Sequence, residues 1–232
     1  MSFNSKYGDA VYIIKAIFIV AVLSGITLSV NAQKEGVEYN WKEKRNKKGI
    51  SISTSKVEGS KYKAIRGVMI VKGTVKELVA LIHDLDECSE WAEMCKESRI
   101  VTKISDTSHY IYVRNDVPFP LTDRDIYTHV TWMHNQNTGK VSMLSTASED
   151  EEMMPKQKGI IRIKNALSQW HFTPKLDGMV LVESFAHIDP AGVSPPWLTN
   201  RLIIDSPYKT MKKMRELIES GKYADSEVSF LK

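Results

Sequence analysis

The sequence has little cysteine, a small net charge and no internal repeat. Its two cysteines, Cys88 and Cys95, lack histidines at metal-ligand spacing and do not predict a zinc site. A formal net charge of +4 is too small to indicate a nucleic-acid binder, so we expect no such partner. The sequence also contains no Gly-rich phosphate-binding loop and no serine in a nucleophile-elbow motif, so it does not predict an enzyme that uses either motif. No cofactor is expected.

The sequence contains one long apolar run, residues 16–30 (AIFIVAVLSGITLSV). It follows the basic residues Lys6 and Lys15, and "VNA" then supplies small or aliphatic side chains, a layout typical of a secretory signal peptide. The run is shorter than the roughly 20 residues of a membrane span. We predict a signal peptide at 1–32, with an uncleaved N-terminal anchor as the alternative, and a single exported domain at 33–232, periplasmic or secreted.

Export bears on both the cysteines and the charge. An oxidising compartment would allow Cys88 and Cys95 to pair, whereas the alternative is two buried thiols. Removing residues 1–32, which contain Lys6, Lys15 and Asp9, lowers the net charge to +3. Such a charge allows at most a weak, transient contact with an anionic membrane surface.

Hydrophobic periodicity predicts an α+β protein. Two strands come first, at 49–57 and 61–71, and a helix at 75–85 follows with Thr74 as its N-cap. Six strands come next, at 99–105, 109–117, 124–133, 140–147, 159–172 and 179–189. The last element is a long helix at 194–221, which begins at Ser194 and Pro195 and kinks at Pro207. A strongly curved antiparallel sheet of this size needs its concave face covered, and only the C-terminal helix is long enough. Such a helix leaves either a packed core or a cavity.

Four segments, in this order, resemble the START (lipid-transfer) domain family. They are DLDECSEWAEMCKESRIV, VPFPLTDRD, MPKQKGIIRIK and DPAGVSPPWLTNRLI. The resemblance implies a helix-grip fold and an exported bacterial member of the family. It also implies that a tunnel between sheet and helix holds, and transfers, one lipid or other hydrophobic molecule, without catalysis.

Strand alternation assigns the cavity walls. The inward face of the strand at 124–133 carries Arg124, Ile126, Thr128, Val130 and Trp132, and Val113 points inward from the strand before it. A buried guanidinium needs partners, and Asp123 and Asp116 are the nearby carboxylates. Either Arg124 forms a structural ion pair that fixes the turn, or it receives the polar end of an apolar ligand.

Later segments supply further expected wall residues: Ala166, Trp170, Glu183, Phe185, Leu198 and Leu202. If Glu183 points inward, it pairs with Arg162 or Arg124; if outward, it is solvated. Because Arg162 shares a face with Ala166, we expect a bulge or register change within 159–172. By the resemblance, Val113, Ile126 and Ala166 replace the aromatic residues that cage choline, so we expect a ligand other than phosphatidylcholine, such as a sterol-like molecule, a fatty acid or an isoprenoid.

Two other functions stay open. The first is a helix-grip enzyme similar to polyketide cyclases or hydratases, with Arg124, Glu183 or a histidine as acid or base. His83, however, lies among carboxylates at a helix end, where a solvated position is expected. The second is a periplasmic adaptor whose cavity is collapsed and whose surface binds a protein. A packed core in place of a cavity would favour the adaptor.

Overall fold

A computed structural model describes residues 38–192 and 196–231, without the side chains of 196–198, 200 and 201. The predicted signal segment at 1–32 and the predicted helix cap at Ser194 and Pro195 lie outside the described residues. Within the described ranges, none of the helices combines the length and the apolar character that crossing a membrane requires.

The described residues form ten strands, three α-helices and one short 3-10 helix. In chain order these are β1 (Lys42–Lys47), β2 (Ile50–Ser55), β3 (Ala64–Lys72), α1 (Val75–His83), α2 (Cys88–Trp91), β4 (Cys95–Ser105), β5 (Ser108–Asn115), β6 (Arg124–Asn135), β7 (Lys140–Ala147), β8 (Ile161–Ile163), β9 (Ala166–Pro174), β10 (Met179–Ile188), α3 (Pro196–Glu219) and η1 (Ser229–Leu231).

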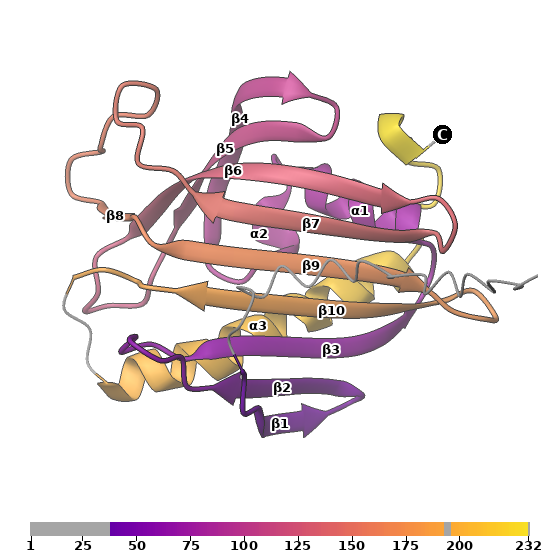
Figure 1. The fold of residues 1–232 in the computed structure, drawn as a ribbon, viewed down its shortest axis with the longest axis horizontal. Helices are drawn as coiled ribbons and strands as arrows, with labels where there is room; N and C mark the ends of the chain where they lie inside the picture. The colour runs from indigo at the N-terminus through magenta and orange to yellow at the C-terminus, as the bar shows by residue number, and fades with distance from the viewer. Residues whose placement is uncertain (1–37, 193–195, 232) are drawn as a thin grey trace, which may run out of the picture. The chain divides into compact units, whose positions relative to one another are not determined.

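The strands form one sheet in the order β1-β2-β3-β10-β9-β7-β6-β5-β4, with antiparallel neighbours throughout, while β8 pairs in parallel with β6. Figure 1 shows α1, α2 and α3 on one face of the curved sheet, with α3 crossing the strands. The predicted α+β helix-grip architecture is therefore confirmed.

The strand count differs from the prediction at two places. β1 was missed because most of its side chains are charged and exposed, as suits a sheet edge, so no apolar alternation marks it. The predicted strand at 159–172 breaks into β8 and β9, and this break is the irregularity that Arg162 led us to expect. Because β8 runs parallel to β6, the prediction of six antiparallel strands was wrong in this segment.

The predicted start of α1 at Thr74 agrees with the structure. Thr74 is the N-cap: its Oγ1 accepts from the backbone N–H of Glu77 at 3.2 Å, and the Glu77 carboxylate accepts from the backbone N–H of Thr74 at 2.6 Å. This capping box fixes where the helix begins. The apolar face of α1 then packs into the core through residues such as Leu78 and Leu81.

Close contact between α3 and the sheet depends on Gly67 of β3. A Cβ at this position would lie 2.5 Å from the Met211 Sδ and 2.6 Å from the Ser184 Oγ. The missing side chain therefore lets α3 approach β3 closely, and Met211 and Met214 of α3 are fully buried there. α3 is assigned as helix through Pro207 and grips the β2–β3 side of the sheet.

Candidate functional site

Two adjoining cavities lie between the sheet and the helices. The inner cavity has a volume of about 230 Å³ and the outer one about 420 Å³. Four residues border both cavities: Asn115, Ser168, Trp170 and Ile188. The two spaces are therefore neighbours that share a wall, rather than separate sites.

The inner cavity lies between the α1–α2 region and the strands from β4 to β9. Most of the residues predicted for the wall border it: Val113, Ile126, Thr128, Val130, Trp132, Ala166 and Trp170. On β6 the predicted alternation holds, because every second side chain from Ile126 to Trp132 faces this space. Its surface is overwhelmingly apolar, so it suits a hydrocarbon group.

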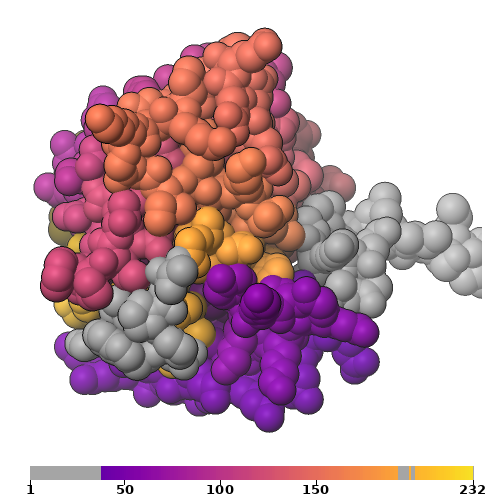
Figure 2. Space-filling view, turned by 90° about the vertical axis from the view of Figure 1, so that its left-hand side faces the viewer, coloured from indigo at the N-terminus to yellow at the C-terminus, as the bar shows by residue number. Residues whose placement is uncertain are grey.

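The outer cavity lies beneath the first turns of α3 and is bordered by the segments that join the strands at one end of the sheet. Of the predicted residues, Arg124, Trp170, Phe185 and Leu202 border it. Residues 61–63, Val117, Leu121 and Pro190 border the outer cavity. Figure 2 shows an end of the molecule where the purple, pink and orange parts of the chain meet. This end is the mouth of the site.

Two predicted wall residues, Leu198 and Glu183, are not among the described residues that border the cavities. The side chain of Leu198 lies outside the described residues, although the residue itself belongs to α3. Glu183 borders neither cavity: its Oε1 accepts from the Arg66 Nη2 at 2.8 Å. Of the two alternatives for Glu183, the inward one with Arg162 or Arg124 as partner is therefore not found, and Arg66 on the adjacent strand β3 is its partner instead.

Arg124 carries the charge in the outer cavity. The residue is 3% exposed, and its guanidinium donates hydrogen bonds to the backbone carbonyls of Thr122 and Pro190. No carboxylate of the described residues forms an ion pair with it. Asp123 accepts from Arg114 at 2.6 Å instead, so the expected ion pair of Arg124 with Asp123 or Asp116 was wrong. Burial lowers the pKa of Arg124, and the charge of the nearby Asp123 offsets only part of this effect.

The neighbouring residue Asp125 lies on the opposite face of β6 and is 1% exposed. Its carboxylate accepts two hydrogen bonds from Arg162 on β8, at 2.7 and 3.1 Å, and Arg162 also donates to the Met154 carbonyl at 3.0 Å. This ion pair ties the loop at 148–160 to the sheet face opposite the cavities. Sequence reasoning missed it because a contact across 37 residues leaves no local pattern.

The inner end of the inner cavity is formed by two stacked rings. His83 and Trp132 lie with their ring centroids 4.7 Å apart, and the His109 ring lies 5.5 Å from His83. Burial, helped by His109 and Lys103, lowers the pKa of His83 to about 4, so the ring is neutral at pH 7. The expectation that His83 is solvated was wrong. Among the described residues, the His83 Nε2 and the indole nitrogens of Trp91 and Trp132 have no hydrogen-bond partner.

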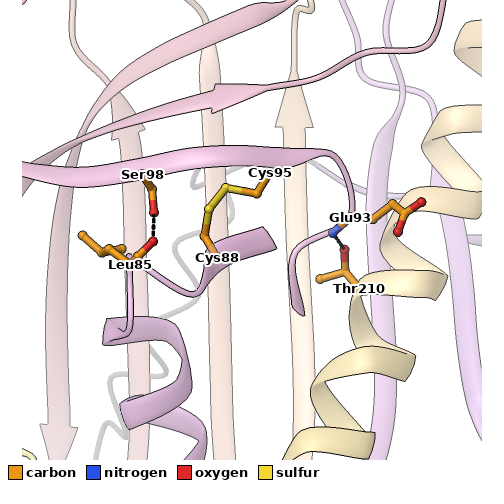
Figure 3. The surroundings of a disulfide bond; sticks show 6 residues. All are labelled: Leu85, Cys88, Glu93, Cys95, Ser98 and Thr210. Atoms are coloured by element: carbon orange, nitrogen blue, oxygen red, sulfur yellow. Dashed lines mark hydrogen bonds between the residues drawn. A yellow bond between two sulfur atoms is a disulfide. The ribbon is translucent and has the colours of Figure 1, made fainter. Parts of the chain in front are cut away.

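A disulfide joins Cys88 and Cys95, and both residues border the inner cavity (Figure 3). On one side of it, the Ser98 hydroxyl donates to the Leu85 carbonyl at 2.7 Å. On the other side, the Glu93 backbone N–H donates to the Thr210 Oγ1 on α3 at 3.0 Å. The bridge therefore holds the segment that connects α1, the cavity wall and α3.

An antiparallel sheet curved over a C-terminal helix, with an apolar hollow between them, defines the helix-grip class of proteins. Comparison with protein families then gives a direct match: the START domain model aligns with residues 28–222. The chain therefore belongs to the START domain family, as the four sequence segments suggested.

Individual relatives agree with this assignment. The chain is 32% identical over 180 residues to an uncharacterized protein of Pseudomonas aeruginosa, covering 78% of this chain and 87% of that one. The crystal structure of a STAR-related lipid transfer protein fragment from Xanthomonas axonopodis has a TM-score of 0.70 and 30% identity, covering 77% of this chain and 98% of that one. Human StAR-related lipid transfer protein 5 shares the fold, with a TM-score of 0.70, 20% identity and coverage of 78% and 88%.

Proposed function

We propose that the protein binds one lipid or other hydrophobic molecule in the two adjoining cavities and carries it between membranes. The observation that carries the proposal is the apolar hollow with a buried guanidinium at its outer part. Together the cavities reach the roughly 300–1,000 Å³ of small-molecule sites. Membership of the START family and the similarity to a lipid transfer protein of Xanthomonas axonopodis support it.

The charge of Arg124 indicates the chemistry of the ligand. A buried guanidinium with only carbonyl partners gains most from an anionic or oxygen-rich group. Arg124 borders the outer cavity and Trp132 the inner one, eight residues apart on the same face of β6. That separation is at most about 26 Å along a strand. Cavities of this volume and length favour a single-chain amphiphile with its polar end at Arg124.

Transient membrane contact is proposed at the mouth of the outer cavity. Phe119, in the segment between β5 and β6, is 94% exposed, and Leu121 two residues later borders the cavity. Lys61 and Lys63 are exposed at the same mouth, and each lysine near an anionic bilayer contributes roughly 1 kcal/mol. An apolar tip flanked by lysines suits brief docking at a lipid surface.

Export to the periplasm or the medium belongs to the same proposal. The disulfide between Cys88 and Cys95 fits an oxidising compartment. We propose that residues 1–32 are a signal peptide and that the mature domain starts after Ala32. N-terminal sequencing of protein recovered from the periplasm or medium tests this, and a mature chain that begins at Met1 contradicts cleavage.

A binding role is favoured over catalysis by the residues around the cavities. Among the described residues that border them, Glu93 is the only carboxylate. Burial alone would raise the pKa of Glu93, but hydrogen bonds from Lys209 at 2.8 Å and Lys213 at 2.9 Å lower it overall. A carboxylate held in this way as an anion is a poor proton donor at pH 7.

The decisive experiment is extraction of the purified mature protein, followed by mass spectrometry of what is released. We expect a hydrophobic molecule in a one-to-one ratio with protein, enriched over its share in the host membranes. Delipidated protein should then withdraw a fluorescent fatty acid from vesicles and deliver it to others. Protein that releases no lipid, and takes none up after delipidation, would contradict the proposal.

A further inference from the structure

The chain continues beyond the part that matches the family model. The match ends at residue 222, shortly after α3 ends at Glu219. Gly221, in the left-handed region with φ of +80°, turns the chain away from the helix. Residues 223–231, which we call the C-terminal strap, then pack onto the domain. Figure 1 shows the strap beside α1.

Contacts with α1 and the core hold the strap in place. The Tyr223 hydroxyl donates to the Asp84 Oδ2 at 3.0 Å, at the residue that caps the end of α1. Burial and this carboxylate raise the pKa of Tyr223 to about 12, so the hydroxyl keeps its proton. Val228 is buried in the same core cluster as α1. The strap is therefore a packed element rather than a trailing end.

Near the end of the strap, Phe230 of η1 lies against the two rings that form the inner end of the cavity. Its ring centroid is 5.8 Å from that of His83 and 5.9 Å from that of Trp132. Phe230 does not border the cavity itself. It lies in contact with two rings that do, and its bulk fills space into which they would otherwise move.

We infer that Phe230 is a specificity-determining positioning residue: through His83 and Trp132 it fixes the inner end of the cavity and thereby the longest chain that fits. The inference rests on the proposed lipid binding. It follows from the packing of the three rings, in which Phe230 lies tilted against the stacked pair of His83 and Trp132, because an end wall of packed aromatic side chains cannot yield to an extra methylene without strain.

The test compares wild type with Phe230→Ala, using delipidated protein and a series of straight-chain fatty acids of increasing length. In the wild type, each added methylene should tighten binding about fourfold until the chain reaches the end wall, after which affinity stops rising. Phe230→Ala should move this limit to longer chains and leave the affinity for short chains unchanged. An unchanged limit in a folded variant overturns the inference.

Leu231→Ala is the matched control, because Leu231 is part-buried in the same 3-10 turn and packs against the same core. It should lose stability without moving the chain-length limit. If Phe230→Ala does not fold, Phe230→Leu keeps most of the packing and should give a smaller shift in the same direction. A shift of equal size in Leu231→Ala would show that the limit reports general loosening and would also overturn the inference.

A second measurement separates this inference from the proposed function. Apolar cavities take up xenon, which changes the NMR shifts of the groups around them. Phe230→Ala should bind more xenon than wild type, with the added changes at Trp132 and His83. If no fatty acid binds to wild type but this signal appears, lipid binding fails while the role of Phe230 at the wall stands. If the signal is absent as well, both fail.

Discussion

Arg124 and Asp125 are neighbours in the chain but lie on opposite faces of β6 and have unrelated partners. Asp125 accepts two hydrogen bonds from Arg162 on the face away from the cavities, whereas Arg124 borders the outer cavity with carbonyls as its partners. The nearest obvious counter-ions of Arg124 are thus committed elsewhere, because Asp123 binds Arg114. Both neighbouring carboxylates, Asp123 and Asp125, therefore have structural partners, and the buried cation of Arg124 has only backbone carbonyls.

Arg124→Met should therefore change ligand selectivity more than stability. Methionine keeps the apolar stem, and a buried charge without a carboxylate adds little to the free energy of unfolding. A fatty acid with a free carboxylate should bind about tenfold to hundredfold more weakly, while its methyl ester is unaffected. Calorimetric titration of both ligands checks this, with Arg124→Lys as the variant that retains the charge. Equal losses for acid and ester would show that Arg124 only shapes the loop.

Removing one partner of the ion pair between Asp125 and Arg162 should lower stability more than it changes ligand selectivity. Asp125→Ala leaves Arg162 buried without its carboxylate and should cost about 3–5 kcal/mol in free energy of unfolding. Arg66→Ala breaks the more exposed pair with Glu183 and serves as control, with an expected cost of about 0–1 kcal/mol. Urea unfolding measures both. Similar costs for the two variants would mean that the Asp125–Arg162 pair does not anchor the loop at 148–160.

Stability should fall on mild acidification because of His83. The pKa of His83 is about 4 in the folded protein and near 6.5 when unfolded. Between these pH values, His83 binds a proton in the unfolded chain but not in the folded one. The stabilisation is complete above pH 6.5 and is lost as pH falls towards 4, by about 2–3 kcal/mol. His83→Gln should flatten this part of the profile in urea unfolding at several pH values. His109, whose pKa burial also lowers, supplies a smaller residual slope.

Loss of the disulfide should loosen the wall between α1 and α3. Cys88 and Cys95 close a short loop, for which chain entropy predicts a contribution of about 2 kcal/mol to the free energy of unfolding. Replacing both with serine should lower the melting temperature and speed hydrogen exchange at Trp91 and Glu93 ahead of the strands. Reductant should reproduce the effect in wild type and add nothing in the double variant. A wild-type melting temperature insensitive to reductant would contradict this role.

Hydrophobic periodicity predicted side-chain orientation correctly where one face of a strand borders the cavity. Ile126 and Val130 of β6 lie on the inner wall as their spacing predicted, because both face the same apolar space. The burial of Asp125 on the other face could not be predicted, because it depends on the loop at 148–160, which covers that face. Glu183 was misplaced for a related reason: its partner Arg66 is 117 residues away. Contacts of this range are set by topology, which no local pattern encodes.

The strap escaped sequence analysis altogether. Its two aromatic residues, Tyr223 and Phe230, show no periodic pattern, and their positions depend on where α3 ends and how Gly221 turns the chain. The family resemblance also stops short of it. Residues that act through a second layer of side chains, as Phe230 does through His83 and Trp132, become visible only when the cavity wall has been located.

One strand, β6, runs from Arg124 at the outer cavity to Trp132 at the inner one, so under the proposed function its length sets how long a bound lipid can be. A lipid shorter than this distance would leave void space, and a longer one would project towards Leu121 and the exposed Phe119, where it would prolong the proposed contact with the bilayer. Cargo length would then decide how readily the loaded protein departs from a membrane.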